Sequence, residues 1–180
     1  PKLLAAITIG QAPRTDVTAD ILPMLPPHVT LREYGALDEL TWEQVMDAFH
    51  PAPGEQVLVS RMRDGRQVRM TEGYVLPRPQ AKIRQAEEEG ADAILLLCTG
   101  SFPAFPHRVL LLEPQEMLHA VVAKLAGGQK VGLLVPMPDQ VEQAYRFWGE
   151  HGVDVTVACA SPYLDFEGVR RAAEQFREQD

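Results

Sequence analysis

The sequence has few of the features that mark nucleic-acid-binding or membrane proteins. It contains no run of basic residues, and its 25 acidic residues outnumber its 17 basic ones, for a formal net charge of −8. A surface of this charge repels nucleic acid and anionic membranes, so neither is expected as a partner. No apolar stretch approaches the roughly 20 residues that a membrane-spanning helix needs. These absences favour a protein that acts on a small molecule.

Cysteine is also scarce, since Cys98 and Cys159 are the only two in the chain. Two thiols make no disulfide framework, and both are expected to be free in a reducing cytoplasm. The CxxC and HExxH spacings of common metal sites are absent, and the five histidines lie far apart in the sequence. The sequence therefore predicts a cytoplasmic protein without a metal cluster.

The most informative segment is an apolar run over residues 93–97, followed by a polar turn that begins with Cys98 and continues with Thr99, Gly100 and Ser101. An apolar run this dense is typical of a strand that is covered on both faces, as in the parallel sheets of α/β proteins. Ligands in open α/β sheets bind beyond the carboxyl ends of the strands. The turn is therefore a candidate site, with Cys98 as a nucleophile or proton carrier. The alternative is a buried structural thiol, because free cysteine is among the most buried residue types.

A second apolar strand, over residues 3–9, ends at a turn that contains Gly10, Gln11 and Arg14. The free N–H groups of a helix start attract anions, and a guanidinium group suits a carboxylate or a phosphate. The turn therefore predicts a small acidic ligand. The alternative for Arg14 is a surface salt bridge with Asp16 or Asp20.

The rest of the chain repeats a unit of strand, turn and helix. Strands are predicted at residues 29–34, 130–135 and 153–158, and helices at residues 15–25, 41–50, 80–89, 115–125, 139–149 and 166–179. Thr41 and Gln44 form a capping box at the start of one helix, and the pair Asp64-Gly65 predicts a β-hairpin over residues 56–70. With right-handed crossovers this order builds an α/β fold with a parallel sheet and flanking helices.

A third strand end, after residue 158, also carries polar groups. Ser161 and Tyr163 are candidate ligand contacts there, because loops at this edge of a sheet often carry function. The alternative is a plain loop with a half-buried tyrosine.

Residues 8–14, 97–100 and 111–114 resemble the AroM family, and the pattern at residues 40–45 and the hairpin around Asp64 fit it too. The resemblance covers essentially the whole chain. AroM proteins are named for a gene neighbourhood linked to aromatic amino acid synthesis. They look like distant relatives of the aspartate/glutamate/hydantoin racemase superfamily, which implies two similar α/β lobes facing each other across a cleft, one catalytic cysteine from each lobe, and no cofactor.

The resemblance assigns roles only in part. Residues 10–14 match the first ligand loop of the superfamily, Cys98 and Thr99 match its first catalytic segment, and residues 136–139 lie where the middle ligand loop would fall. The second catalytic cysteine should follow a further strand, and Cys159 lies one strand too early. We therefore expect the natural protein to continue by roughly 40 residues past Asp180, on base-rate lengths for one more strand–helix–strand unit.

Together these observations predict a first lobe over residues 1–100, with the hairpin as an insertion, and an incomplete second lobe over residues 101–180. The leading functional hypothesis is a cofactor-independent, racemase- or isomerase-like proton transfer on a small carboxylate. Cys98 would carry the proton, and Arg14 with the N–H groups of residues 10–12 would hold the carboxylate. A one-thiol decarboxylase, or a non-enzymatic sensor of an aromatic or shikimate-type acid, stays open, and a homo-oligomer is compatible with either.

Overall fold

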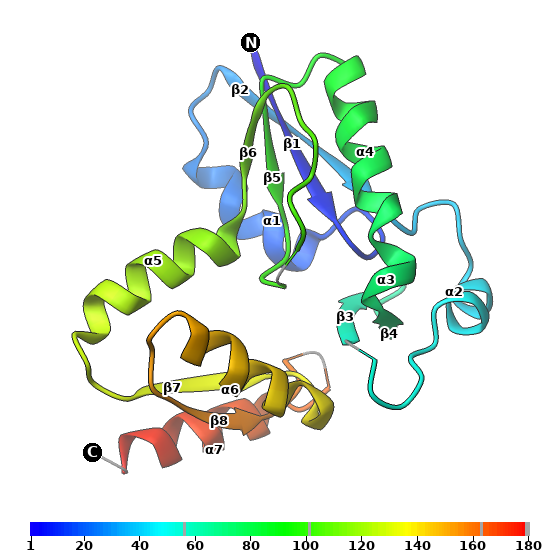
Figure 1. The fold of residues 1–180 in the computed structure, drawn as a ribbon. Helices are drawn as coiled ribbons and strands as arrows, with labels where there is room; N and C mark the ends of the chain where they lie inside the picture. The colour runs from blue at the N-terminus through cyan, green and yellow to red at the C-terminus, as the bar shows by residue number, and fades with distance from the viewer. Residues whose placement is uncertain (56, 101, 163, 179–180) are drawn as a thin grey trace. The chain divides into compact units, whose positions relative to one another are not determined.

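The computed structural model describes residues 1–55, 57–100, 102–162 and 164–178. The chain forms two compact units, Pro1–Gln115 and Glu116–Asp180 (Figure 1). The boundary that the sequence suggested, at residue 100, falls inside the first unit, because a short strand after it, Leu110–Leu112, pairs with the first sheet. None of the helices in the described part of the chain combines the length and the apolar character needed to cross a bilayer.

The first unit is built on a four-stranded parallel sheet with the strand order β2-β1-β5-β6. The strands are β1 (Lys2–Thr8), β2 (Val29–Gly35), β5 (Ala93–Leu96) and β6 (Leu110–Leu112). The dense apolar runs of the sequence form the two central strands, β1 and β5, which are paired so that Ile7 lies beside Leu96. The predicted α/β fold with a parallel sheet is confirmed.

Helices and a hairpin complete this unit. The helices are α1 (Thr15–Ile21), η1 (Leu22–Met24), α2 (Trp42–Ala48), α3 (Glu72–Val75) and α4 (Pro77–Glu88). Helix α4 lies along the sheet (Figure 1), and its residues Ile83 and Ala86 are buried in the cluster that contains Ile7 and Ile94 of the sheet. The capping box at Thr41 and Gln44 is present as predicted.

The predicted hairpin is formed by β3 (Val57–Arg61) and β4 (Gln67–Thr71), which pair antiparallel. Gly65 occupies the turn with a φ of 92°, a left-handed conformation that glycine adopts without a steric cost. Leu58, Val68 and Met70 of the hairpin share a buried cluster with Leu37 and Val45. The hairpin is therefore held by apolar packing against α2 and the loop after β2, and Arg61 at the end of β3 bonds to the turn after β1.

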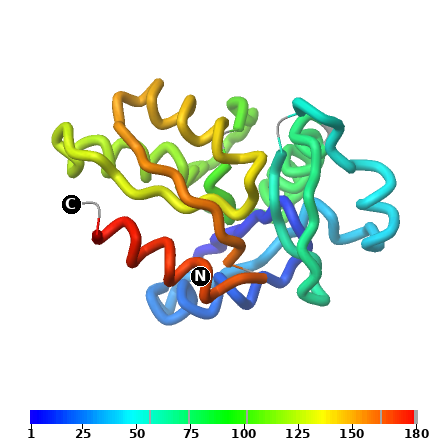
Figure 2. Tube along the Cα trace, turned by 90° about the horizontal axis from the view of Figure 1, so that it is seen from below, coloured from blue at the N-terminus to red at the C-terminus, as the bar shows by residue number. Residues whose placement is uncertain are grey.

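The second unit contains a two-stranded parallel sheet of β7 (Val131–Val135) and β8 (Val155–Cys159). Its helices are α5 (Pro114–Ala126), η2 (Pro138–Gln140), α6 (Val141–Glu150) and α7 (Phe166–Arg177). Helix α7 runs beside β7 and β8 (Figure 2). The ring of Phe176 lies so close to Gly132 that a Cβ atom there would be 2.6 Å from it. The apolar face of α7 therefore covers this small sheet.

Candidate functional site

The candidate site lies at the carboxyl edge of the first sheet. Strands β1 and β5 are parallel neighbours, so the turns that follow them emerge at the same edge. The ladder continues one step past β5, where the N–H of Leu97 donates to the carbonyl of Ile7 at 2.7 Å. Arg14 and Cys98 thus come from adjacent strand ends, as their positions in the sequence predicted.

Arg14 lies at the centre of a buried polar network. Its Nε and Nη2 atoms donate to the two carboxylate oxygens of Asp16, each at 2.9 Å, and its side chain is only 5% exposed. The Nη1 atom donates to the hydroxyls of Thr8, at 3.2 Å, and Ser60, at 3.5 Å. Of the two readings of Arg14, the pairing with Asp16 is present, but it joins a buried guanidinium to a carboxylate that stays partly exposed, so it is not a pair of two surface groups.

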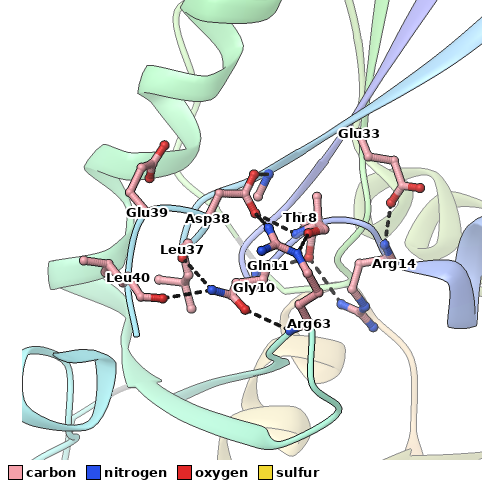
Figure 3. A network of polar contacts seen from close by, with 12 residues as sticks. Thr8, Gly10, Gln11, Arg14, Glu33, Leu37, Asp38, Glu39, Leu40 and Arg63 are labelled. Carbon is pink, nitrogen blue, oxygen red and sulfur yellow. Dashed lines mark hydrogen bonds and ion pairs between the residues drawn. The ribbon is translucent and has the colours of Figure 1, made fainter. Parts of the chain in front are cut away.

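The backbone N–H groups of the turn after β1 also have partners inside the unit (Figure 3). Gly10 donates to the hydroxyl of Thr8 at 3.1 Å, Gln11 to the carbonyl of Arg61 at 3.1 Å, and Ala12 to Asp38 at 2.8 Å. The N–H of Arg14 donates to Glu33 at 2.5 Å. Three of these N–H groups tie the turn to the hairpin, to β2 and to the loop after β2, the fourth is paired within the end of β1, and in this structure none of the four is left for an anion.

The side chain of Gln11 ties three loops together. Its amide nitrogen donates to the carbonyls of Leu37, at 3.1 Å, and Leu40, at 2.9 Å, and its oxygen accepts from the N–H of Arg63 at 2.9 Å. Figure 3 shows these contacts around Gly10. The two polar atoms of the Gln11 amide are thus engaged by the protein, which favours a structural role over the ligand contact that the sequence suggested.

Cys98 follows β5 and is half-buried. Its Sγ accepts from the N–H of Gly100 at 3.3 Å, and its side chain packs against the cluster that contains Leu58. Burial raises the pKa of the Cys98 thiol, and the Gly100 N–H, the Arg14 charge and the Thr99 backbone oppose this rise. The free protein therefore holds a protonated thiol at neutral pH, with the groups that would stabilise a thiolate already in place.

The remaining predicted site residues follow either β5, in the first unit, or β8, in the second unit. Thr99 is exposed and Gly100 is half-buried beside Cys98, whereas Ser101 lies outside the described residues. Ser161 is buried in the turn before α7, where its carbonyl accepts from the N–H of Asp165 at 2.8 Å. Tyr163 also lies outside the described residues. Ser161 belongs to the second unit, whereas Arg14 and Cys98 belong to the first.

Sequence reasoning missed the hairpin's contribution to this site. Ser60 supplies a hydroxyl to Arg14, Arg63 donates to Asp38 at 3.2 Å, and Asp38 also binds the turn after β1. The signal in the sequence was the group of arginines beside the Asp64-Gly65 turn, where arginine has no role in forming a hairpin.

We expect iodoacetamide to label Cys98 slowly in the native protein near neutral pH. The thiolate is the reactive form, and burial raises the pKa of both thiols, but Cys98 is half-buried whereas Cys159 is exposed and open to the reagent. Mass mapping of labelled peptides over time should find Cys159 modified first. The control is the denatured chain, in which both thiols should react alike. Faster labelling of Cys98 than of Cys159 in the folded protein would contradict this prediction.

Replacing Asp16 with asparagine should destabilise the first unit, because it removes the charged partner of a buried guanidinium. Asp16 remains 26% exposed, so the expected loss is modest, about 1–2 kcal/mol at neutral pH. The pair with Arg14 is the largest cause that lowers the pKa of Asp16 below its usual 3.8. A lowered carboxyl pKa stabilises the fold above the unfolded-state value and loses this effect as the pH falls through the folded-state value.

Urea denaturation of wild type and the Asp16→Asn variant should therefore differ at pH 7 and converge as the pH falls below about 4. Asp20→Asn is the matched control, since Asp20 is an exposed carboxylate on the same helix. A gap between wild type and Asp16→Asn that does not narrow in acid would show that the ion pair is not its source.

Comparisons with known proteins agree with this fold. The family described as "AroM protein" matches residues 4–180. Among curated protein sequences no match was found. Among solved structures, the chain is similar to an allantoin racemase from Klebsiella pneumoniae, with a TM-score of 0.57 and 12% sequence identity, over 100% of this chain and 71% of that one. At this identity the likeness concerns the fold alone, and it confirms the racemase-like architecture that the sequence predicted.

Proposed function

The chain belongs to the AroM family and has a racemase-like fold, and from this premise we propose that it is a cofactor-independent enzyme that transfers a proton at a carbon atom of a small carboxylate. The proton carrier in this proposal is the thiol of Cys98. The observation that carries it is the position of this thiol at the carboxyl end of a central strand, where the charge of Arg14 acts on it.

The environment of Cys98 suits a proton donor. Burial keeps the proton on sulfur, and a protonated thiol can deliver that proton to a carbanion that develops on the substrate. The carbanion forms when a thiolate at Cys98, which has given its proton to water, takes the proton of the substrate's C–H bond and becomes a thiol. After the thiol has exchanged its proton with solvent, the S–H bond breaks as the new C–H bond forms, which leaves the thiolate again. The N–H of Gly100, 3.3 Å from Sγ, and the positive charge of Arg14 stabilise this thiolate. The thiolate then recovers a proton from water or from the next substrate molecule.

Arg14 and Thr99 are the groups that we assign to the carboxylate. Two donors of Arg14 are held by Asp16, which fixes the plane of the guanidinium group. The Nη1 atom makes the longest of the hydrogen bonds described for this side chain, 3.2 and 3.5 Å, both to neutral hydroxyls. A charge-assisted bond to a carboxylate is stronger than these, so Nη1 can exchange partners at the lowest cost. Thr99 is exposed and contributes its hydroxyl.

A decarboxylase is the second candidate, favoured by the single thiol that the first unit places at this edge. Loss of carbon dioxide leaves a carbanion, and one proton donor is enough to complete that reaction, whereas racemisation needs proton transfer at both faces of the carbon. A non-enzymatic sensor is the third candidate. It is favoured by the pairing of Arg14 with Asp16 and by the protonated thiol of Cys98, because neither group is then in a reactive form.

Proton nuclear magnetic resonance in D₂O separates these functions. The panel would contain 2-amino and 2-hydroxy acids, substituted malonates, aromatic and shikimate-type acids, and allantoin, which the name of the structural neighbour supplies. We expect solvent deuterium to enter the carbon next to the carboxylate of at least one compound. Carbon dioxide release together with deuterium uptake would identify the decarboxylase. Thermal stabilisation by one of the compounds, with neither exchange nor decarboxylation of any compound in the panel, would refute the enzyme and support the sensor.

A further inference from the structure

A second group of reactive side chains lies in the second unit and includes no residue used above. Glu116 and His119 belong to α5, and His151 directly follows α6. One donor atom of each residue lies within 4.8 Å of the donor atoms of the other two. The scattered positions of the histidines in the sequence predicted no such cluster, and this prediction is wrong for His119 and His151.

Two elements bring these donors together. Glu116 and His119 are three residues apart on α5 and therefore lie on one face of the helix. His119 is only 2% exposed and packs among the rings of Phe147 and Trp148, at centroid distances of 4.3 and 4.5 Å. The ring of His151 lies 4.3 Å from that of His119. The packing fixes the His119 ring, while the exposed Glu116 and His151 leave the cluster accessible from solvent.

The hydrogen bond of His151 orients its ring for coordination. Its Nδ1 lies 2.8 Å from the carbonyl oxygen of Phe147. A carbonyl oxygen only accepts, so Nδ1 carries a hydrogen, and Nε2 is the ring nitrogen that remains to coordinate a metal ion. Metal-binding histidines commonly hold their second nitrogen in this way, which sets the tautomer and the ring orientation.

We propose that Glu116, His119 and His151 form a binding site for a divalent transition-metal ion such as Zn²⁺. Two imidazoles and one carboxylate are a donor set that Zn²⁺ takes with a fourth position left for water, and imidazole ligands disfavour Mg²⁺ and Ca²⁺. Such an ion would link α5 to the end of α6.

The donor spacing fits this assignment after a small adjustment. Tetrahedral coordination with metal–donor distances of about 2.0–2.2 Å places the donors roughly 3.3–3.6 Å apart. The donor atoms now lie within 4.8 Å of one another, and rotation of the exposed side chains can shorten their separations to about 3.3–3.6 Å. Glu116 is exposed and can rotate, and His119, which is buried, does not need to move.

The test is a titration of the full chain with Co²⁺, whose visible spectrum reports the number and type of its ligands. We expect saturable binding of one Co²⁺ per chain, displaced by one equivalent of Zn²⁺. Glu116→Gln and His151→Ala should each weaken Co²⁺ binding by roughly tenfold or more, because even the loss of a residue that supports a ligand costs about 10–100-fold. Both side chains are exposed, so the fold should persist, as circular dichroism would verify.

Two control variants match these changes in chemistry. Glu150→Gln removes an exposed carboxylate next to His151, and His28→Gln removes an exposed imidazole from the first unit. Both should leave the affinity for Co²⁺ unchanged. The proposal is overturned if Co²⁺ does not saturate, if both site variants bind as well as wild type, or if a thiolate-to-cobalt charge-transfer band places the metal on a cysteine.

Discussion

Exchange of a substrate's carbon-bound proton with solvent is expected to fall by roughly 10²–10⁴-fold when Cys98 is replaced by serine. Serine keeps the shape of the side chain, but its hydroxyl holds its proton far more tightly than a thiol does. The loss should therefore appear in the rate of the chemical step, and thermal stabilisation by the same compound should be retained. Deuterium uptake at saturating substrate gives the rate of the bound complex, and uptake at limiting substrate gives the ratio of that rate to the Michaelis constant.

Cys159→Ser is the matched control for this variant. Cys159 is the other free thiol, it is exposed, and it lies at the end of β8 in the second unit. Its replacement should leave exchange unchanged. Equal exchange by wild type and Cys98→Ser would remove the thiol from the mechanism. Equal losses in the Cys98 and Cys159 variants would mean that both thiols take part, in contradiction to the single-thiol proposal.

The second large expected effect is a loss of stability when Gly10 is replaced by alanine. A Cβ atom at this position would lie 2.4 Å from the carbonyl oxygen of Arg61, 2.4 Å from the hydroxyl of Ser60, and 3.2 Å from the N–H nitrogen of Arg61. Two of these three atoms belong to the backbone of β3, which cannot rotate away as a side chain can. The hairpin would have to move, and the bond from the Gln11 N–H to the Arg61 carbonyl would lengthen. We expect Gly10→Ala to lower the free energy of unfolding by roughly 3 kcal/mol.

Gly149→Ala supplies the control for Gly10→Ala. A Cβ atom at Gly149 would have no atom within 4 Å, and the residue lies in α6, where alanine is the better helix former by about 1 kcal/mol. Both changes restrict the unfolded chain equally, so the difference between them isolates the steric effect in the folded state. Urea unfolding should show a loss for Gly10→Ala and a small gain for Gly149→Ala. Similar stabilities of the two variants would show that the hairpin can shift to make room for the Cβ atom without lowering the free energy of unfolding.

Local signals accounted for most of the secondary structure. The apolar runs became β1 and β5, the capping box at Thr41 starts α2, and the Asp64-Gly65 pair lies in the turn between β3 and β4. Two of the helices differ from their predicted bounds because of a proline. The helix predicted over residues 15–25 divides near Pro23 into α1 and η1, and α4 begins at Pro77, three residues earlier than predicted, because proline suits a first helical turn.

The candidate site was predicted in position but not in detail. Parallel strands that alternate with helices place their carboxyl ends together, so the shared edge of Arg14 and Cys98 follows from the order of the elements. The partners of Arg14 could not be predicted in full, because Ser60 reaches it from a hairpin that is distant in sequence. The same holds for Gln11, whose side-chain partners lie on two other loops.

The sequence by itself determined the α/β class, the parallel central strands, the hairpin, and the edge at which Cys98 lies. Each of these depends on neighbouring residues or on the order of elements, which a single chain records directly. Only the tertiary structure decided that Arg14 is buried and paired with Asp16, that burial keeps Cys98 protonated, and that His119 meets His151 and Glu116. Burial and the distances between such groups are set by packing between segments far apart in the chain, and no local pattern of residues encodes them.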